Sequence, residues 1–152
     1  MKIALASDHG GFQLKQAVMK HLDEKGYEYV DYGCYTEESC DYPDMAARAC
    51  RAIQRGECDR GIIFCGTGLG ISMAANKFRG IRCAAVSDYY GAKYCRLHND
   101  ANILSLGGRI LGEGEAEELV DVFLTTEFEG GERHSRRIEK IAEIERGELP
   151  ET

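Results

Sequence analysis

The sequence predicts an α/β protein in which helices cover both faces of a parallel, five-stranded sheet. Short apolar runs alternate along the chain with segments whose apolar residues recur at the spacing of one helix face. The runs are nearly continuous, which is typical of strands buried on both faces. Regular alternation of strand and helix is the pattern of a sheet with helices on both sides.

Five strands are predicted from the apolar runs. Each is short, and the second is rich in residues that favour a pleated backbone. The predicted strands cover residues 2–6, 27–32, 61–64, 81–86 and 102–106.

Six helices are predicted between and after the strands. Gly26 follows the first as a residue typical of helix ends, and Pro43 stands in the first turn of the second. Ser87 and Asp88 are candidates to cap the fourth. The first helix is marked by the apolar stripe Leu14, Ala17, Val18, His21 and Leu22. The predicted helices lie near residues 14–25, 41–55, 71–78, 88–98, 116–124 and 133–146.

Composition limits the classes of function. A length of 152 residues is expected to form one domain, 1–152, with a frayed tail at 147–152. The net charge of −7 argues against a general nucleic-acid or anionic-membrane surface. No apolar run reaches the roughly 20 residues of a membrane span, and no signal-peptide pattern is present. Seven cysteines, an odd number without a Cys-x-x-Cys pair, favour free thiols in the cytoplasm.

The stretch from Arg60 to Asn76 carries the strongest chemical signal. A buried strand ends at Cys65, and then Gly66, Gly68 and Gly70 alternate with other residues before a helix. This order points backbone N–H groups at whatever occupies the loop, and a thiol there is well placed to ionise. A tight turn with a structural cysteine is an equally simple interpretation. The loop fits neither the dinucleotide-binding nor the P-loop fingerprint.

Other chemistry-bearing side chains follow predicted strands. Ligands of parallel sheets bind outside the carboxyl ends of the strands, so these residues are expected to gather at one edge. They are Asp8, His9, Cys65, Thr67, Ser87 and Arg109.

Three further candidates come from elsewhere in the chain. His98 stands in a polar cluster and is suited to proton transfer near neutral pH, although a lone histidine is more often a surface or capping residue. Arg133 and Arg137 share a helix face, where two guanidinium groups can grip one phosphate. Such a pair is also common on a solvated face. No residues have convincing metal-ligand spacing, so no metal site is expected.

Several of these motifs occur together in one known family. The chain resembles the type B ribose-5-phosphate isomerases, a family that includes galactose-6-phosphate isomerase subunits and allose-6-phosphate isomerases. The resemblance runs from Lys2 to about Ile144. Its motifs are Ser7-Asp-His-Gly-Gly11, Asp41-Tyr-Pro43, Cys65-Gly-Thr-Gly-Leu-Gly-Ile-Ser72, Ala74-Ala-Asn-Lys77, Arg96-Leu-His-Asn-Asp100, and Glu129-Gly-Gly131 with Arg133-His134.

The resemblance implies a Rossmann-like, three-layer α/β/α sandwich. It also implies a homodimer or dimer of dimers with active sites shared between chains. The implied reaction is aldose–ketose isomerisation of a sugar phosphate without metal or cofactor, most simply between ribose 5-phosphate and ribulose 5-phosphate.

The resemblance also assigns roles to residues. Cys65 matches the general base, and His98 matches the group that opens the sugar ring with help from Asp8. The anion hole around the enediolate matches Gly66, Thr67, Gly68, Leu69 and Gly70. Phosphate contacts match His9, Arg109, Arg133 and Arg137, and sugar contacts match Tyr42 and Asn99.

One departure and three alternatives accompany this interpretation. The family usually runs Gly-Gly-Arg-His, whereas here Glu132 intervenes before Arg133, so Arg136 is the fallback for the phosphate. A six-carbon substrate, allose 6-phosphate or galactose 6-phosphate, would keep the mechanism. A non-catalytic phosphosugar-binding module would have no need of the thiol. A redox-sensing thiol protein ranks last because no cysteine neighbours Cys65 in the sequence.

Overall fold

The fold is built on one parallel sheet, seen in a computed structural model that describes residues 1–151. Its five strands have the order β2-β1-β3-β5-β4, and every neighbouring pair is parallel. The strands are β1 (Lys2–Ser7), β2 (Glu28–Asp31), β3 (Arg60–Cys65), β4 (Cys83–Ala85) and β5 (Ile103–Gly107). The predicted parallel sheet is therefore confirmed.

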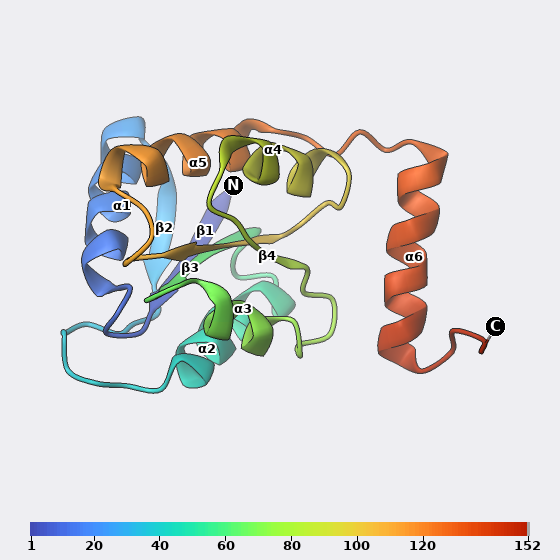
Figure 1. Ribbon diagram of the computed structural model, residues 1–152, viewed down its shortest axis with the longest axis horizontal. Coiled ribbons are helices and arrows are strands. Elements are labelled where there is room, and N and C mark those ends of the chain that lie inside the picture. The colour runs from blue at the N-terminus through green and yellow to red at the C-terminus, as the bar shows by residue number, and fades with distance from the viewer. Residues whose placement is uncertain (152) are drawn as a thin grey trace.

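Helices cover both faces of this sheet (Figure 1). One layer contains α1 (Phe12–Lys25), α4 (Tyr89–Leu97) and α5 (Glu113–Thr125), and the other contains α2 (Tyr42–Gln54) and α3 (Leu69–Ala75). A last helix, α6 (Glu132–Arg146), stands apart from the sandwich (Figure 1). The three-layer α/β/α architecture expected from the resemblance is confirmed.

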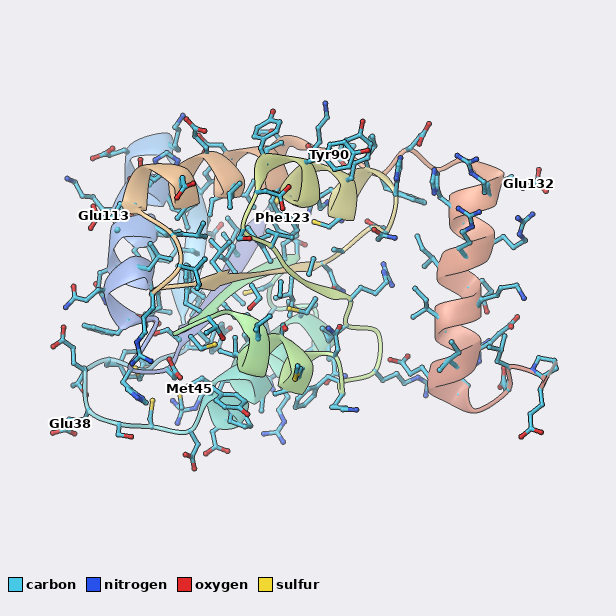
Figure 2. All side chains as sticks on the ribbon, in the orientation of Figure 1. Glu38, Met45, Tyr90, Glu113, Phe123 and Glu132 are labelled. Carbon is cyan, nitrogen blue, oxygen red and sulfur yellow. The ribbon has the colours of Figure 1, made fainter. Side chains whose placement is uncertain are left out.

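Each face of the sheet has its own apolar core. Ile62 and Phe64 of β3 belong to the core under α1, α4 and α5, whereas Ile63 and Cys65 belong to the core under α2 and α3. This division follows from the two-residue period of a strand, which sends successive side chains to opposite faces. Phe123 of α5 is fully buried in the first core (Figure 2).

Several elements begin or end a few residues from the predicted positions, and for α3 and β4 the structure shows the reason. The helix α3 ends at Ala75 rather than near Phe78, because the side chain of Asn76 bonds both backbone groups of Cys83, at 2.8 and 2.9 Å. Such local bonding competes with helix continuation. The edge strand β4 covers residues 83–85 instead of 81–86, since it has one neighbour to pair with.

Most of the local signals predicted from the sequence are confirmed. Asp88 caps α4 by accepting a hydrogen bond from the Gly91 N–H at 2.7 Å, and Gly26 ends α1 with φ of 75°. The stripe of α1 differs from prediction at two positions: Lys15 is fully buried, and Ala17 is half-buried.

The last helix has few contacts with the sandwich. His134 is the residue of α6 that is buried, while Ile141 and Ile144 expose 47% and 60% of their surface. A groove of about 590 Å³ lies between α6 and the β4 edge. The expected tail, 147–152, begins at Gly147, the residue that follows α6, and its last residue lies outside the described part of the chain. No helix within residues 1–151 is long and apolar enough to cross a membrane.

Candidate functional site

The carboxyl end of β3 presents a thiol to a backbone N–H group of the glycine loop. Cys65 is the last residue of β3 and exposes 4% of its surface. The Gly68 N–H lies 3.1 Å from its sulfur atom. A donor at this distance stabilises negative charge that develops on the sulfur.

Gly68 takes a conformation that suits glycine. Its φ is +76°, and a Cβ atom there would lie 3.0 Å from the carbonyl carbon of Leu106. The carbonyl of Gly68 also accepts a hydrogen bond from the Ser105 hydroxyl at 2.6 Å. Close packing against β5 therefore fixes the loop, and with it the N–H that faces Cys65.

The first strand delivers two polar residues to the same edge. Asp8 is buried, and its carboxylate accepts a hydrogen bond from the Gly11 N–H at 3.1 Å. The Nδ1 atom of His9 accepts one from the Cys40 N–H at 3.3 Å. A neutral His9 ring bonded in this way carries its proton on Nε2, which is left to donate to a ligand.

Arg109 and Tyr42 enclose the glycine loop. The Arg109 backbone N–H donates to the Gly66 carbonyl at 2.9 Å, and a Cβ atom on Gly66 would lie 3.0 Å from the Arg109 guanidinium. A Cβ atom on Gly70 would lie 2.9 Å from the Tyr42 ring. The exposed Thr67 and Leu69 complete the loop between them. The structure thus brings together Asp8, His9, Tyr42, Cys65, Gly66, Thr67, Gly68, Leu69, Gly70 and Arg109 at one edge of the sheet.

The other predicted site residues lie away from this edge. Helix α4 runs back across the sheet, and His98 and Asn99 follow its last turn. The Asn99 carbonyl accepts a hydrogen bond from Arg82, which directly precedes β4. His98 and Asn99 therefore lie near the amino ends of the strands. Because β3 has six residues, the two edges are roughly 20 Å apart. Within one chain, His98 does not meet Cys65.

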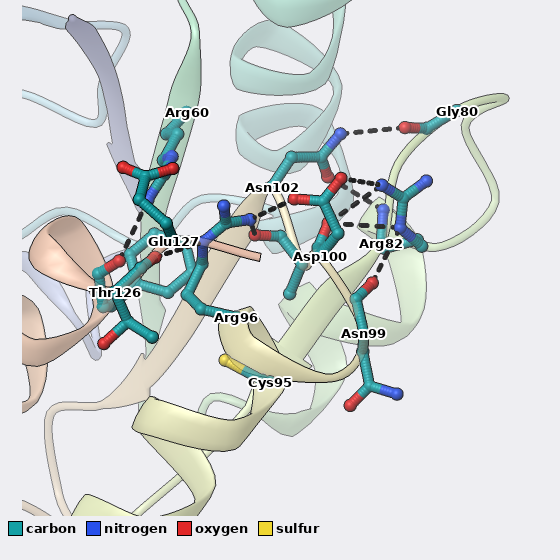
Figure 3. Close-up of polar contacts among 12 residues, drawn as sticks. Arg60, Gly80, Arg82, Cys95, Arg96, Asn99, Asp100, Asn102, Thr126 and Glu127 are labelled. Atoms are coloured by element: carbon teal, nitrogen blue, oxygen red, sulfur yellow. Dashed lines mark hydrogen bonds and ion pairs between the residues drawn. The ribbon is translucent and has the colours of Figure 1, made fainter. Parts of the chain in front are cut away.

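Charged contacts hold the turn that follows α4 (Figure 3). Asp100, with φ of 46°, receives the Arg96 guanidinium at 2.7 Å and the Arg82 guanidinium at 3.1 Å. Arg96 is buried and also donates to the Ala101 and Thr126 carbonyls. These contacts fix the backbone directly after His98.

His98 packs against residues from two other segments. Its ring stacks on that of His134, with centroids 4.2 Å apart and planes within 12° of parallel. The Glu129 carboxylate lies 3.4 Å from Nε2 of His134 and 3.9 Å from Nε2 of His98. Burial lowers the pKa of His134, and the neighbouring His98 and Arg133 lower it further.

These three residues are also a group of side chains with the donor types of a metal site. The spacing along the sequence does not reveal them, because they come from the residue after α4, the α5–α6 loop and α6. A metal ion, however, needs ring lone pairs that converge on one point. Since the two rings are nearly parallel, their in-plane lone pairs do not converge in this geometry.

Arg133 and Arg137 lie on α6, and both are exposed. Glu132 is the first residue of this helix (Figure 2). Glu129 and His134 belong to motifs that carry the resemblance, but the sequence interpretation assigned neither a role in the site. No periodicity connects either with His98, so the contact between the two rings became evident only in three dimensions.

Comparison with known proteins identifies close relatives. Residues 3–141 match the Ribose/Galactose Isomerase family. The chain is 47% identical to Ribose-5-phosphate isomerase B of Escherichia coli over 144 residues, which cover 95% of this chain and 96% of the relative. A putative sugar phosphate isomerase of Bacillus subtilis is 49% identical over 150 residues, covering 98% and 100%.

Solved structures agree with these sequence relationships. Ribose-5-Phosphate Isomerase B of Clostridium thermocellum has a TM-score of 0.95 at 52% identity, with 97% of this chain and 99% of that chain covered. The Mycoplasma genitalium enzyme with bound ribulose-5-phosphate has a TM-score of 0.90 at 41% identity, covering 95% and 96%.

Proposed function

Since this chain belongs to the ribose/galactose isomerase family, we propose that it interconverts ribose 5-phosphate and ribulose 5-phosphate. Membership makes the chain a sugar-phosphate isomerase, which is an intramolecular oxidoreductase. The aldehyde carbon C1 is reduced while the hydroxyl-bearing carbon C2 is oxidised, and no external electron carrier takes part. The names of the relatives favour the five-carbon substrate.

One observation carries the proposed chemistry: the thiol of Cys65 faces the Gly68 N–H at 3.1 Å in a loop of glycines. In the proposed step, the Cys65 thiolate removes the proton from C2 of the open-chain aldose and later returns a proton to C1. The intermediate is an enediolate, whose negative oxygen needs pre-oriented donors. The backbone N–H groups from Gly66 to Gly70, with Thr67, are suited to that task.

Substrate binding is proposed to use the groups around this loop. His9 and Arg109 would contact the phosphate, with Arg133 and Arg137 as further cationic partners. Tyr42 and Asn99 would contact the sugar hydroxyl groups. Phosphate contacts far from the reacting carbons position C1 and C2 without sharing in the chemistry.

The ring form of the substrate needs a separate step. Ribose 5-phosphate exists mainly as a furanose, which must open before C2 can lose its proton. Opening breaks the bond between C1 and the ring oxygen, removes a proton from the anomeric hydroxyl and adds one to the ring oxygen. We assign these proton transfers to His98, assisted by Asp8.

Two copies of the chain are needed to assemble these groups. His98, Asn99, Arg133 and Arg137 lie away from the Cys65 edge, so one chain cannot place them on the same substrate. A homodimer, or a dimer of dimers, can place these residues of one copy at the Cys65 edge of another. The exposed Ile141 and Ile144 on α6, which is sparsely covered by its own chain, support such an association.

The location of the enzyme is proposed to be cytoplasmic. All seven cysteines, each within residues 1–151, are free thiols. Free thiols in this number are stable in a reducing compartment.

Turnover by the purified chain tests the proposed function. Ribose 5-phosphate and allose 6-phosphate are compared side by side, with EDTA present. We expect a higher kcat/KM for the pentose and no loss of activity with EDTA. Preference for the hexose would retain the mechanism but change the substrate. Absence of turnover on both, and on galactose 6-phosphate, would contradict catalysis and favour a phosphosugar-binding module.

A further inference from the structure

The surroundings of His98 carry an inference that rests on the proposed function. Three segments meet at its ring: Tyr94 of α4 contacts it edge-on at 4.7 Å, His134 of α6 stacks on it at 4.2 Å, and Glu129 approaches from the α5–α6 loop. The loop is tied to α4, because the Glu129 N–H donates to the Leu97 carbonyl at 3.0 Å. The His98 ring is therefore restrained by neighbours on two sides.

Charge distinguishes the two stacked rings. The His134 side chain is 10% exposed and that of His98 is 35% exposed. Burial lowers the pKa of His134, the charges of His98, Arg133 and Arg137 lower it further, and Glu129 opposes them. A neutral His134 can stack on His98 in either protonation state without repulsion between like charges. The Glu129 carboxylate lies between the two rings' Nε2 atoms, 3.4 Å from that of His134 and 3.9 Å from that of His98, so it is within reach of the more exposed ring as well.

We propose that His134 and Glu129 are positioning residues for the ring-opening step. His134 holds the plane of the His98 imidazole, and Glu129 stabilises the protonated form that donates to the ring oxygen. Neither residue touches the substrate in this proposal. The role differs from packing alone, because it predicts a defect confined to substrates that must open a ring.

The two substrates of the reaction allow this distinction. In ribulose 5-phosphate the oxygen on C5 carries the phosphate, so no hydroxyl is available to close a five-membered ring on C2. This sugar is an open chain, and loss of its C1 proton needs the base but not the ring opener. Exchange of C1 hydrogen into deuterium oxide therefore reports the base alone, whereas turnover of ribose 5-phosphate reports ring opening as well.

The test compares Glu129→Gln and His134→Phe with Glu132→Gln, a matched change of an exposed carboxylate at the start of α6. We expect kcat for ribose 5-phosphate to fall about tenfold or more in Glu129→Gln and His134→Phe. This loss is a part of the rate factor of about 10²–10⁴ that a general acid–base group contributes. C1 exchange in ribulose 5-phosphate should stay within about twofold of the native rate. The control variant should behave as the native protein in both assays.

A titration followed by NMR provides a second readout. Because the Glu129 carboxylate raises the pKa of His134, Glu129→Gln should lower that pKa further. Equal losses of turnover and exchange in both variants would overturn the proposal, as would native turnover in both. If instead Cys65→Ala exchanged C1 hydrogen at the native rate, the proposed function itself would be wrong.

Discussion

At the scale of residues, the proposed chemistry depends on the contact between Cys65 and the Gly68 N–H. An ordinary thiol is mostly protonated near neutral pH, so a base of this kind needs a nearby donor. Gly68 supplies it from a backbone with φ of +76°. The cysteine and the glycine are three positions apart, and this is why the sequence was sufficient to predict the loop.

Replacing the proposed base tests this arrangement. Cys65→Ala should lower kcat for ribose 5-phosphate by about 10²–10⁴, the usual contribution of a general acid–base group, because no other thiol adjoins the loop in the sequence. The same substitution should change the free energy of unfolding by only a small fraction of its native value. Steady-state kinetics and urea unfolding measure the two effects. Near-native turnover would exclude Cys65 as the base.

Other residues were beyond the reach of sequence reasoning. A lysine in a surface helix is normally solvated. Lys15 of α1 is nevertheless fully buried, and its Nζ atom lies 2.6 Å from the Asp31 carboxylate. His134 and His98 meet across two helices. Both contacts depend on how elements pack, and periodicity within an element does not encode a partner in another.

At the scale of elements, the sequence predicted every strand and helix, and the errors lie at their ends. The helix ends that were predicted correctly depend on residues next to the helix, such as the glycine after α1 and the aspartate before α4. The end of α3 was missed because it depends on Asn76 reaching the backbone of Cys83. The order of strands also required the structure, since β5 inserts between β3 and β4.

The cap of α4 gives a prediction at this scale. Asp88→Ala should lower the free energy of unfolding by about 1 kcal/mol, because the Gly91 N–H loses its acceptor. Asp88→Asn is the matched control, since an amide oxygen caps almost as well. Urea unfolding at a fixed protein concentration measures both. An equal loss in the two variants would show that charge, and not the hydrogen bond, is what Asp88 contributes.

At the scale of the whole molecule, the position of α6 is the main feature. It carries Arg133, Arg137 and His134, and its side chains Ile141 and Ile144 are exposed beside a groove of about 590 Å³. The resemblance implied sites shared between chains, and the separation of His98 from Cys65 within one chain supports that proposal. In a parallel sheet, the helix between two strands returns the chain from the carboxyl edge to the amino edge. The predicted alternation of strands and helices therefore already implies that His98, after α4, and Cys65, at the end of β3, lie at opposite edges.

Mixing two inactive variants, Cys65→Ala and His98→Gln, tests the shared site most directly. Random reassortment of a symmetric dimer makes half of the dimers mixed, and each mixed dimer would hold one intact site of its two. We therefore predict recovery of about one quarter of native turnover of ribose 5-phosphate after the two are unfolded and refolded together. Variants refolded separately and then assayed together provide the control. Mixed dimers that form but remain inactive would contradict a site built from two chains.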